Sequence, residues 1–358
     1  MSVPPNQGPA VPLDDVTRSV SEMYAKFPYP SPQAGGAKLK ELVNLLKLFS
    51  MENRYDLAGK TVLDAGTGTG HRLIEAAAAF KNTRFMAIDI CEPPLALARQ
   101  TAAERGLENV EFRLFNLMDD AQVLGKFDVV LSMGVIHHLS DPAIGLRNLV
   151  HNMADDGICF LYIYGRHGSR ERLRRKAIVS LLLQGNRKDF ERGIDLVKQL
   201  GFDSFDYGWN LNVDDEKSRD ALIVDAYLNV NENLYDTDSL FELVRPSGLH
   251  RFVAYGVTLD KHGYLFESRL DQGARLNVKT TDPTTLLGGP AAREAYNQLT
   301  LADRYRVIDL LFQPNGYTLI GFKEGAVRHF PENGRILANT LSVKDLQGRA
   351  LTAAVRQS

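Results

Sequence analysis

The stretch "TVLDAGTGTGHRLIEAAAAF", residues 61–80, decides the fold class of this 358-residue chain. An apolar run of strand length ends at Asp64, and Gly66, Gly68 and Gly70 follow at alternate positions before an alanine-rich helical segment. Glycine permits positive φ and close approach of a ligand, and a helix N-terminus offers unpaired N–H groups. The stretch therefore predicts a strand, a ligand-binding turn and a helix. A tight turn without a ligand is the alternative.

Around this stretch, short apolar runs alternate with helix-like segments. The spacing predicts strands in "TVLDAG", "TRFMAIDI", "VEFRLFNL", "FDVVLSMG" and "GICFLYIYG", and helices in "GHRLIEAAAAF", "PPLALARQTAAERG" and "DPAIGLRNLVHNM". Such alternation is typical of a parallel sheet covered on both faces by helices. After Gly165 the pattern becomes mostly helical, and strand character returns in "LHRFVAYGV" and "YTLIGFKEG".

This pattern divides the chain into a core and inserted segments. We expect an enclosing cap, which suits a small ligand better than a macromolecular surface. The expected units are a flexible tail (1–14), an N-terminal helical cap or lid (15–55), a ligand-binding core (56–165), a mostly helical cap insertion (166–235), a return to the core (236–257), a second insertion (258–316), the last core strand (317–327) and a C-terminal tail (328–358).

Composition argues against several classes of protein. Lys plus Arg total 42 and Asp plus Glu total 44, so the formal charge of −2 implies no general attraction to nucleic acid or to an anionic membrane. Two cysteines and scattered histidines predict neither a disulfide scaffold nor a metal site. Without a signal-peptide pattern or a membrane-spanning apolar run, the chain is expected to be soluble and cytoplasmic.

A glycine turn of this kind suits either a dinucleotide or an adenosyl sulfonium, and the residues in and beside it have to distinguish the two ligands. Its G-x-G-x-G spacing differs from the G-x-G-x-x-G pattern of dinucleotide sites. Asp64 would repel a pyrophosphate and attract an ammonium or a sulfonium group. Asp89, at the end of the second predicted strand, suits the ribose hydroxyls of either ligand. The residues favour the sulfonium and leave a nicotinamide-dependent oxidoreductase as a rival.

The motifs as a set resemble one enzyme family. "VLDAGTGTG", "FMAIDI", "VEFRLFNL" and "FDVVLSMGVIHHLSDPAIGLRNLVHNMADDGICFLYIY" are similar to class I S-adenosylmethionine-dependent methyltransferases over about residues 60–165. "MYAKFPYPSP" together with "GVIHHLSDP" resembles a bacterial subgroup with a Phe-Pro-Tyr-Pro-like leader. The resemblance implies a doubly wound, mostly parallel, seven-stranded Rossmann-like α/β sheet with a helical cap, and S-adenosylmethionine as cofactor.

The resemblance also implies which residues bind the cofactor. His71, which opens the helix after the glycines, would touch the cofactor carboxylate, with simple capping or surface exposure as the alternative. Asn116 stands where the family usually has an aspartate, and its amide oxygen can still accept a bond from adenine. The remaining implied contacts are Asp64, Gly66, Gly68 and Gly70 with the methionine end, Asp89 with the ribose, Ile90 and Leu117 with the adenine, and Met133 and Gly134 with the sulfur.

The histidine pair after the fourth predicted strand is the candidate for catalysis. His137 and His138 would lie at the mouth of the pocket, and histidine titrates near neutral pH. If the acceptor is a hydroxyl, one of them can remove its proton, which makes O-methylation the first expectation. Adjacent side chains do not easily face the same way, so the other would pack. A structural or cofactor-contacting role for both is the alternative.

Aromatic and basic residues supply candidates for the lid and the acceptor site. Tyr24 and Tyr29, in "YAKFPYP", suit a lid over the site, or else a staple holding the tail. Tyr164 ends the fifth predicted strand, and Arg166 and Arg170 follow it, suited to an anionic group of a small acceptor or else to a solvated helix face. Methylation of tRNA or protein and a non-catalytic binding module are the rival functions. A homodimer is the default assembly.

Overall fold

The computed structural model describes residues 13–31, 41–53, 55–119, 124–203, 215–257, 267–271, 275–279, 286–326 and 341–342. Of the two expected tails, only residues 13, 14, 341 and 342 fall within these ranges, so their other residues lie outside the description. Within the described residues, no helix is long and apolar enough to cross a membrane.

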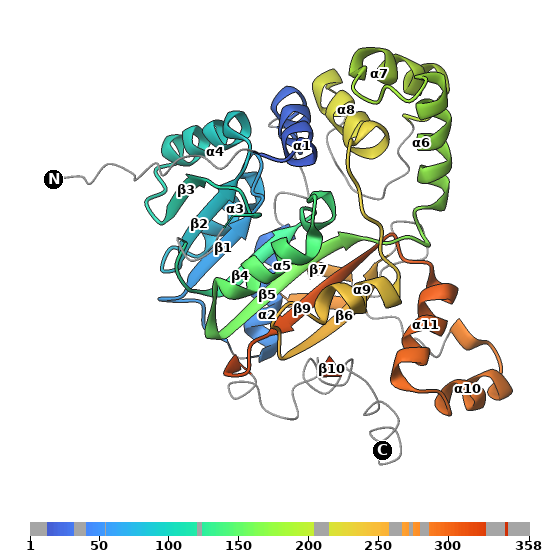
Figure 1. The fold of residues 1–358 in the computed structure, drawn as a ribbon. Coiled ribbons are helices and arrows are strands. Elements are labelled where there is room, and N and C mark those ends of the chain that lie inside the picture. Colours follow the sequence, from blue (N-terminus) through green and yellow to red (C-terminus); the bar gives the residue numbers. More distant parts are fainter. Residues whose placement is uncertain are drawn as a thin grey trace.

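The fold is organised around an eight-stranded sheet with the order β10-β6-β9-β5-β4-β1-β2-β3 (Figure 1). Neighbouring strands from β3 to β5 pair in parallel, whereas β9 runs antiparallel between β5 and β6. The seven core strands are β1 (Thr61–Ala65), β2 (Arg84–Asp89), β3 (Val110–Leu114), β4 (Phe127–Met133), β5 (Met153–Tyr164), β6 (Arg251–Val257) and β9 (Gly316–Phe322).

This arrangement confirms the predicted doubly wound, mostly parallel sheet of seven strands. The strand order reverses between β1 and β4, which is where such sheets open a crevice for a ligand. The sequence did not indicate the eighth strand, β10 (Leu341–Ser342), which pairs antiparallel with β6 at the edge.

Helices cover both faces of the sheet. Side chains of successive strand residues point to opposite faces, so Val130 joins one core while Val129 and Leu131 join the other. The first core is closed by α5 (Pro142–His151) and α9 (Thr237–Val244). The second is closed by α2 (Glu41–Asn53) and α3 (His71–Ala79). Because both faces are buried, the strands read as continuous apolar runs in the sequence.

Local signals in the sequence account for where the helices begin and end. Asp14 caps α1 (Asp15–Lys26) by accepting from the backbone N–H of Thr17, and the helix ends just before the Phe27–Pro28 step. Asp141 caps α5, which has proline at its first position. Gly106, with φ of 63°, follows the end of α4 (Glu92–Glu104).

A third apolar core lies in a helical layer beyond the strand ends (Figure 1). Met23 of α1 belongs to it, so the N-terminal helix packs with segments about 150 or more residues later in the chain. The other contributors are α6 (Arg170–Leu182), α7 (Phe190–Gln199), α8 (Glu216–Ile223) and the π-helical turn η4 (Val224–Leu228). We call these elements, with α1, the cap.

The stretch expected to be a second insertion contains strands as well as helices. Its described parts are the β7 (Glu267–Asp271) and β8 (Arg275–Lys279) hairpin, α10 (Pro290–Asn297) and α11 (Leu301–Phe312). Tyr305 of α11 packs edge-on against Phe241 of α9, with ring centroids 5.9 Å apart. This contact joins α11 to the helical layer of the first core.

Candidate active site

A cavity of about 270 Å³ lies at the carboxyl ends of β1, β2, β4 and β5 and is covered by the cap. Most of the side chains singled out from the sequence meet there, although they come from six separate stretches of chain. The predicted residues that line it are Tyr24, Tyr29, Asp64, Gly66, Gly68, His71, Asp89, Ile90, Asn116, Leu117, Met133, Gly134, His138 and Tyr164. Gly70, His137, Arg166 and Arg170 do not line it.

Contacts within the protein partly explain why glycine occupies these positions of the turn. Gly66, Gly68 and Gly70 all have positive φ, at 78°, 56° and 69°. A Cβ on Gly66 would lie 2.2 Å from the side chain of Val135, and one on Gly68 would lie 2.9 Å from the carbonyl oxygen of Tyr29. The turn is therefore tightly enclosed by the loop after β4 and by the N-terminal segment, and side chains are excluded from it.

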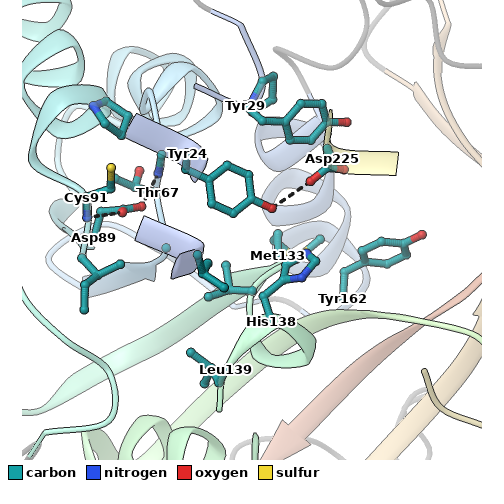
Figure 2. A pocket seen from close by; sticks show the side chains of 18 of the residues that line it. Tyr24, Tyr29, Thr67, Asp89, Cys91, Met133, His138, Leu139, Tyr162 and Asp225 are labelled. Carbon is teal, nitrogen blue, oxygen red and sulfur yellow. Dashed lines mark hydrogen bonds between the residues drawn. The ribbon is translucent and has the colours of Figure 1, made fainter. Parts of the chain in front are cut away.

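Asp89 ties this turn to the end of β2 (Figure 2). Its carboxylate accepts from the backbone N–H of Gly68 at 2.7 Å and from that of Cys91 at 2.9 Å. Desolvation raises the pKa of Asp89, while these backbone N–H groups act in the opposite direction. A carboxylate has about four lone-pair sites, so it can also accept from two neighbouring hydroxyls in the cavity, as a ribose would present.

Asp64 places a second carboxylate at the same end of the cavity. The residue is 7% exposed, and burial raises its pKa to about 6, with the nearby Asp89 adding to the rise and Arg72 opposing it. Arg72 also lines the cavity. A buried carboxylate whose charge is poorly solvated is stabilised by a cation placed beside it. Asp64 can thus receive the ammonium group of an amino-acid moiety, and Arg72 its carboxylate.

Asn116 has local partners that orient its amide. Its Oδ1 accepts from the backbone N–H of Met118 at 3.0 Å, and its Nδ2 donates to Asp119 at 3.3 Å. The oxygen retains a second lone pair, and Ile90 and Leu117 line the cavity nearby. This corner offers apolar walls and one polar acceptor, which suits a planar heterocycle with an amino group.

The structure separates the two histidines of η3 (Ile136–His138). His137 is completely buried, and its ring stacks on Tyr164 with the centroids 3.9 Å apart. His138 lines the cavity, and its Nδ1 lies 2.8 Å from the carbonyl oxygen of Asn231. Because a carbonyl only accepts, Nδ1 carries the proton and Nε2 has a free lone pair. Nε2 is buried and has no hydrogen-bond partner among the described residues.

A run of alternating asparagines, Asn229, Asn231 and Asn233, holds the histidine turn. Asn231 Nδ2 donates to the carbonyl oxygens of His138 and Leu139, at 3.0 and 2.9 Å. The backbone N–H of Asn233 donates to the carbonyl oxygen of His137 at 2.8 Å. Asn229 Nδ2 donates to the hydroxyl of Tyr24 at 3.2 Å. The sequence analysis missed this segment, although the alternation in "NVNEN" was a usable signal.

The opposite end of the cavity is built around Asp225, which the sequence analysis also missed. Its Oδ1 accepts from the hydroxyl of Tyr24 at 2.8 Å (Figure 2), and its Oδ2 accepts from that of Tyr164 at 3.3 Å. Desolvation and the Asp225 charge raise the pKa of both phenols well above the ordinary value, so both stay protonated. No local sequence motif indicates that Asp225 belongs to the cavity, because its position there depends on tertiary contacts with Tyr24 of α1 and Tyr164 of β5.

The arginines selected from the sequence lie outside the cavity. Arg166 is exposed and pairs with Asp236 at 3.1 Å, and Arg170 is exposed at the start of α6. A neighbouring arginine, Arg172, lines the cavity instead, at 2.7 Å from Glu232. Its position one turn into α6 carries it inward. Among the described residues, no group of three or more His, Cys, Asp or Glu side chains is placed to hold a metal ion.

Comparison with known proteins identifies the core. Residues 56–175 match the family model of a methyltransferase domain. A Synechococcus protein described only as uncharacterized, syc1184_c, is 28% identical over 312 residues, covering 83% of this chain and 69% of its own length. The ubiquinone biosynthesis O-methyltransferase of Pseudomonas paraeruginosa is 34% identical over 126 residues, covering 35% of this chain and 53% of its own.

A solved structure shares the fold. PKMT2 from Rickettsia typhi, determined in complex with AdoHcy, aligns with a TM-score of 0.52 and 17% identity over 78% of this chain and 52% of its own. The match thus spans about half the length of that protein, as it does for the ubiquinone enzyme. The domain match and the sheet order agree: residues 56–175 form a methyltransferase domain.

Proposed function

We propose that this methyltransferase methylates an oxygen atom of a small-molecule acceptor and that His138 is its general base. The observation that carries the proposal is that Asp64, Asp89 and the glycine turn line the same cavity as His138, whose Nε2 has no hydrogen-bond partner among the described residues. When bound, S-adenosylmethionine supplies a methyl group activated by a positively charged sulfur. The residues of this chain hold that donor, position the acceptor and receive its proton.

The cofactor is assigned to the end of the cavity that carries Asp89 and the glycine turn. Asp64 would bind its ammonium group, and Asp89 its ribose hydroxyls. Gly66 and Gly68 allow the methionine portion to approach the main chain, and Met133 and Gly134 lie at the end of β4, where the sulfur is expected. The predicted roles of the other cofactor-contact residues stay as the resemblance implies them, namely His71, Ile90, Asn116 and Leu117.

His138 is assigned the proton transfer because it has the required protonation state. Burial lowers its pKa, so the imidazole is neutral at neutral pH, with Asp225 and the Asn231 carbonyl acting in the opposite direction. The Asn231 carbonyl holds the proton on Nδ1 and leaves Nε2 to accept one. General-base assistance of this kind contributes about 100- to 10,000-fold. His137 is assigned a packing role behind Tyr164.

Closure of the cavity supports a small acceptor over tRNA or protein. The site is covered by α1, where Thr17, Val20 and Tyr24 line it, and by η4 of the inserted segment. We infer that the cap excludes water during transfer. Of the helices described in the expected N-terminal segment, only α1 contributes to it, because α2 packs on the sheet in the second core. The ubiquinone O-methyltransferase relatives support oxygen as the methylated atom. A homodimer stays a prediction, which light scattering on the purified chain would decide.

Two measurements test the proposal. Calorimetric titration with S-adenosylhomocysteine is expected to show one site per chain, and incubation with methyl-labelled cofactor and fractionated cell extract is expected to label a low-molecular-mass fraction. His138→Ala should abolish most of that labelling and leave the titration unchanged, whereas His151→Ala, at the exposed end of α5, should alter neither. Label only in RNA or protein, or full labelling by His138→Ala, would overturn the proposal.

A further inference from the structure

We propose that the Asp225 end of the cavity binds an ammonium group of the acceptor, held by the Asp225 carboxylate and surrounded by tyrosines. This inference rests on the proposed function, because it concerns the acceptor taken by the same cavity. It names the acceptor's class: a small molecule with a protonated amine in addition to the atom that is methylated.

Asp225 is a buried carboxylate presented to the cavity. The residue is 4% exposed and lies in η4, a π-helical turn whose five residues are all buried. Such turns displace side chains from the regular helical position and occur frequently at functional sites. The phenols of Tyr24 and Tyr164 each donate to one carboxylate oxygen. Each oxygen therefore keeps a lone pair, and a ligand donor in the cavity can use it.

Asp225 forms no ion pair with any residue that the structure describes. Two cationic side chains of α6 pair with a different carboxylate, Glu232: Arg172 lies 2.7 Å and Lys176 lies 3.1 Å from it. Glu232 does not line the cavity, whereas Asp225 does. A buried charge is normally paired or hydrogen-bonded, and a ligand cation would complete the pairing of this one.

Aromatic residues surround the carboxylate. Tyr24, Tyr29 and Tyr162 line the same end of the cavity, and Figure 2 shows them grouped with Asp225 and His138. The ring of Tyr164 lies between His137, at 3.9 Å, and the Arg172 guanidinium, at 5.3 Å, so Tyr164 contributes its hydroxyl and not its face. The faces of tyrosine rings and a carboxylate together attract cations and especially ammonium groups.

The arrangement disfavours the other acceptor classes. An anionic group would face the Asp225 charge at short range in a poorly solvated site. Arg166 and Arg170, the residues that suggested an anion, lie outside the cavity, and Arg172, which lines it, is already paired with Glu232 at 2.7 Å. A neutral donor group would form a hydrogen bond with the Asp225 carboxylate but would not pair with its charge. The other cation that could lie beside Asp225 is the sulfonium of S-adenosylmethionine. S-adenosylhomocysteine lacks this charge, so comparing the affinities of the two ligands shows whether Asp225 binds the sulfonium or the acceptor.

The test uses simple probes on the full chain saturated with S-adenosylhomocysteine. Calorimetry compares 2-phenylethylammonium with its neutral analogue 2-phenylethanol and with the anion 3-phenylpropanoate. The ammonium probe is expected to bind about tenfold or more tightly than either of the others, since one desolvated charge pair commonly contributes that much. Asp225→Asn is expected to remove this preference and to leave the affinities for S-adenosylmethionine and S-adenosylhomocysteine unchanged.

A matched control and three outcomes decide the inference. Asp220→Asn removes a carboxylate in α8 that pairs with Lys198 at 2.8 Å, outside the cavity, and should keep the ammonium preference. Equal or tighter binding of the neutral or anionic probe would overturn the inference, and so would a preference that survives Asp225→Asn. Weaker binding of S-adenosylmethionine alone by Asp225→Asn would assign the carboxylate to the sulfonium and also overturn it.

Failure of the proposed function is read separately. If the wild-type chain does not bind S-adenosylhomocysteine, the proposed function falls, and the same three probes titrated into the free protein still decide the ammonium site. If Asp225→Asn does not fold, as judged by its thermal unfolding transition, the ranking of the probes on the wild-type chain carries the decision alone.

Discussion

The carboxylate of Asp89 lies 2.7 Å from the backbone nitrogen of Gly68, which joins the end of β2 to the glycine turn after β1. The two residues are 21 positions apart, and the sequence predicted only that both would lie at the same sheet edge. The hydrogen bond makes them one unit: a ligand that reaches the ribose acceptor also reaches the bare main chain.

Gly68→Ala is expected to weaken cofactor binding about tenfold or more, since a Cβ would meet the Tyr29 carbonyl at 2.9 Å and push the N-terminal segment off the turn. The matched control is Gly106→Ala, which has a similar φ of 63° but no atom within 4 Å of its Cβ. Both variants should lose about 1–2 kcal/mol of stability from the left-handed backbone conformation. Only Gly68→Ala should change the calorimetric affinity for S-adenosylhomocysteine, and equal affinities in the two would refute the packing argument.

Asp64→Asn is expected to stabilise the free protein and to weaken cofactor binding. The folded-state pKa of Asp64 is raised to about 6 from 3.8, so the native state binds more protons than the unfolded state between these values. The Asp64 charge thus costs stability that grows as pH rises from about 4 to 6 and persists above that range, on the order of 1–3 kcal/mol. Thermal unfolding should show the variant more stable than wild type at pH 7.5 and equal to it at pH 4.

The same group predicts proton linkage on binding. An ammonium beside Asp64 favours its ionised form, so S-adenosylhomocysteine should displace a proton from the wild-type protein near pH 6 and bind more weakly as pH falls below that value. Calorimetry in buffers of different ionisation enthalpy measures this release. Undiminished release in Asp64→Asn would show that another group is responsible.

His138 is expected to be neutral at pH 7, with the proton on Nδ1. Burial lowers its pKa from 6.5, so the native state resists protonation and stability should fall as pH drops through about 6.5, where the unfolded chain takes up the proton. NMR of histidine labelled with ¹⁵N should show an unprotonated Nε2 and a titration below that of a free histidine. The labelling reaction should stay constant above pH 7 and decline in acid; an acid limb unchanged in His138→Ala would exclude this group.

Asn231→Ala is expected to hold His138 less firmly without removing it: the backbone carbonyl that accepts from Nδ1 remains, but the side-chain amide that fixes this carbonyl against the histidine turn is lost. The amide of Asn231 donates to the carbonyl oxygens of His138 and Leu139, and two lost hydrogen bonds to the turn commonly cost about 1–3 kcal/mol. Transfer should slow about tenfold because the reacting groups are less well aligned, while cofactor affinity holds. The His138 tautomer should become mixed by NMR, a change that a purely structural role would not cause. Asn297→Ala, on exposed α10, serves as the control.

The cofactor half of the site could be predicted from the sequence because its determinants are local. Each of these groups lies in the last residues of a strand or directly after it: Asp64 near the end of β1 with the glycines after it, Asp89 at the end of β2, and Met133 at the end of β4. Parallel strands bring their carboxyl ends to one edge, so the order of strands and helices along the chain places these residues together. Local signals likewise mark some helix ends: α1 and α5 begin after capping aspartates, α1 ends just before the Phe27–Pro28 step, and Gly106 follows the end of α4.

The acceptor half could not be predicted in this way. Asp225 belongs to a segment with no ligand-binding pattern and meets Tyr24 across 201 positions of sequence. Arg172 and Tyr162 lie close in sequence to the selected Arg170 and Tyr164, but local patterns did not indicate which members of those segments line the cavity. The choice between His137 and His138 also lay beyond local reasoning, because adjacent residues on a short turn differ only in what surrounds them. The surroundings, Tyr164 on one side and the Asn231 carbonyl on the other, come from distant parts of the chain.

The sequence by itself determined the alternation of strands and helices, the glycine turn and the carboxylates beside it, and hence the fold class of the core. Hydrophobic periodicity and turn chemistry act over a few residues, so they can be read without knowing the fold. Only the tertiary structure decided that His138 and not His137 lines the cavity and that Asp225 lines it as well. Those properties depend on burial and on hydrogen bonds between segments whose packing no local pattern specifies.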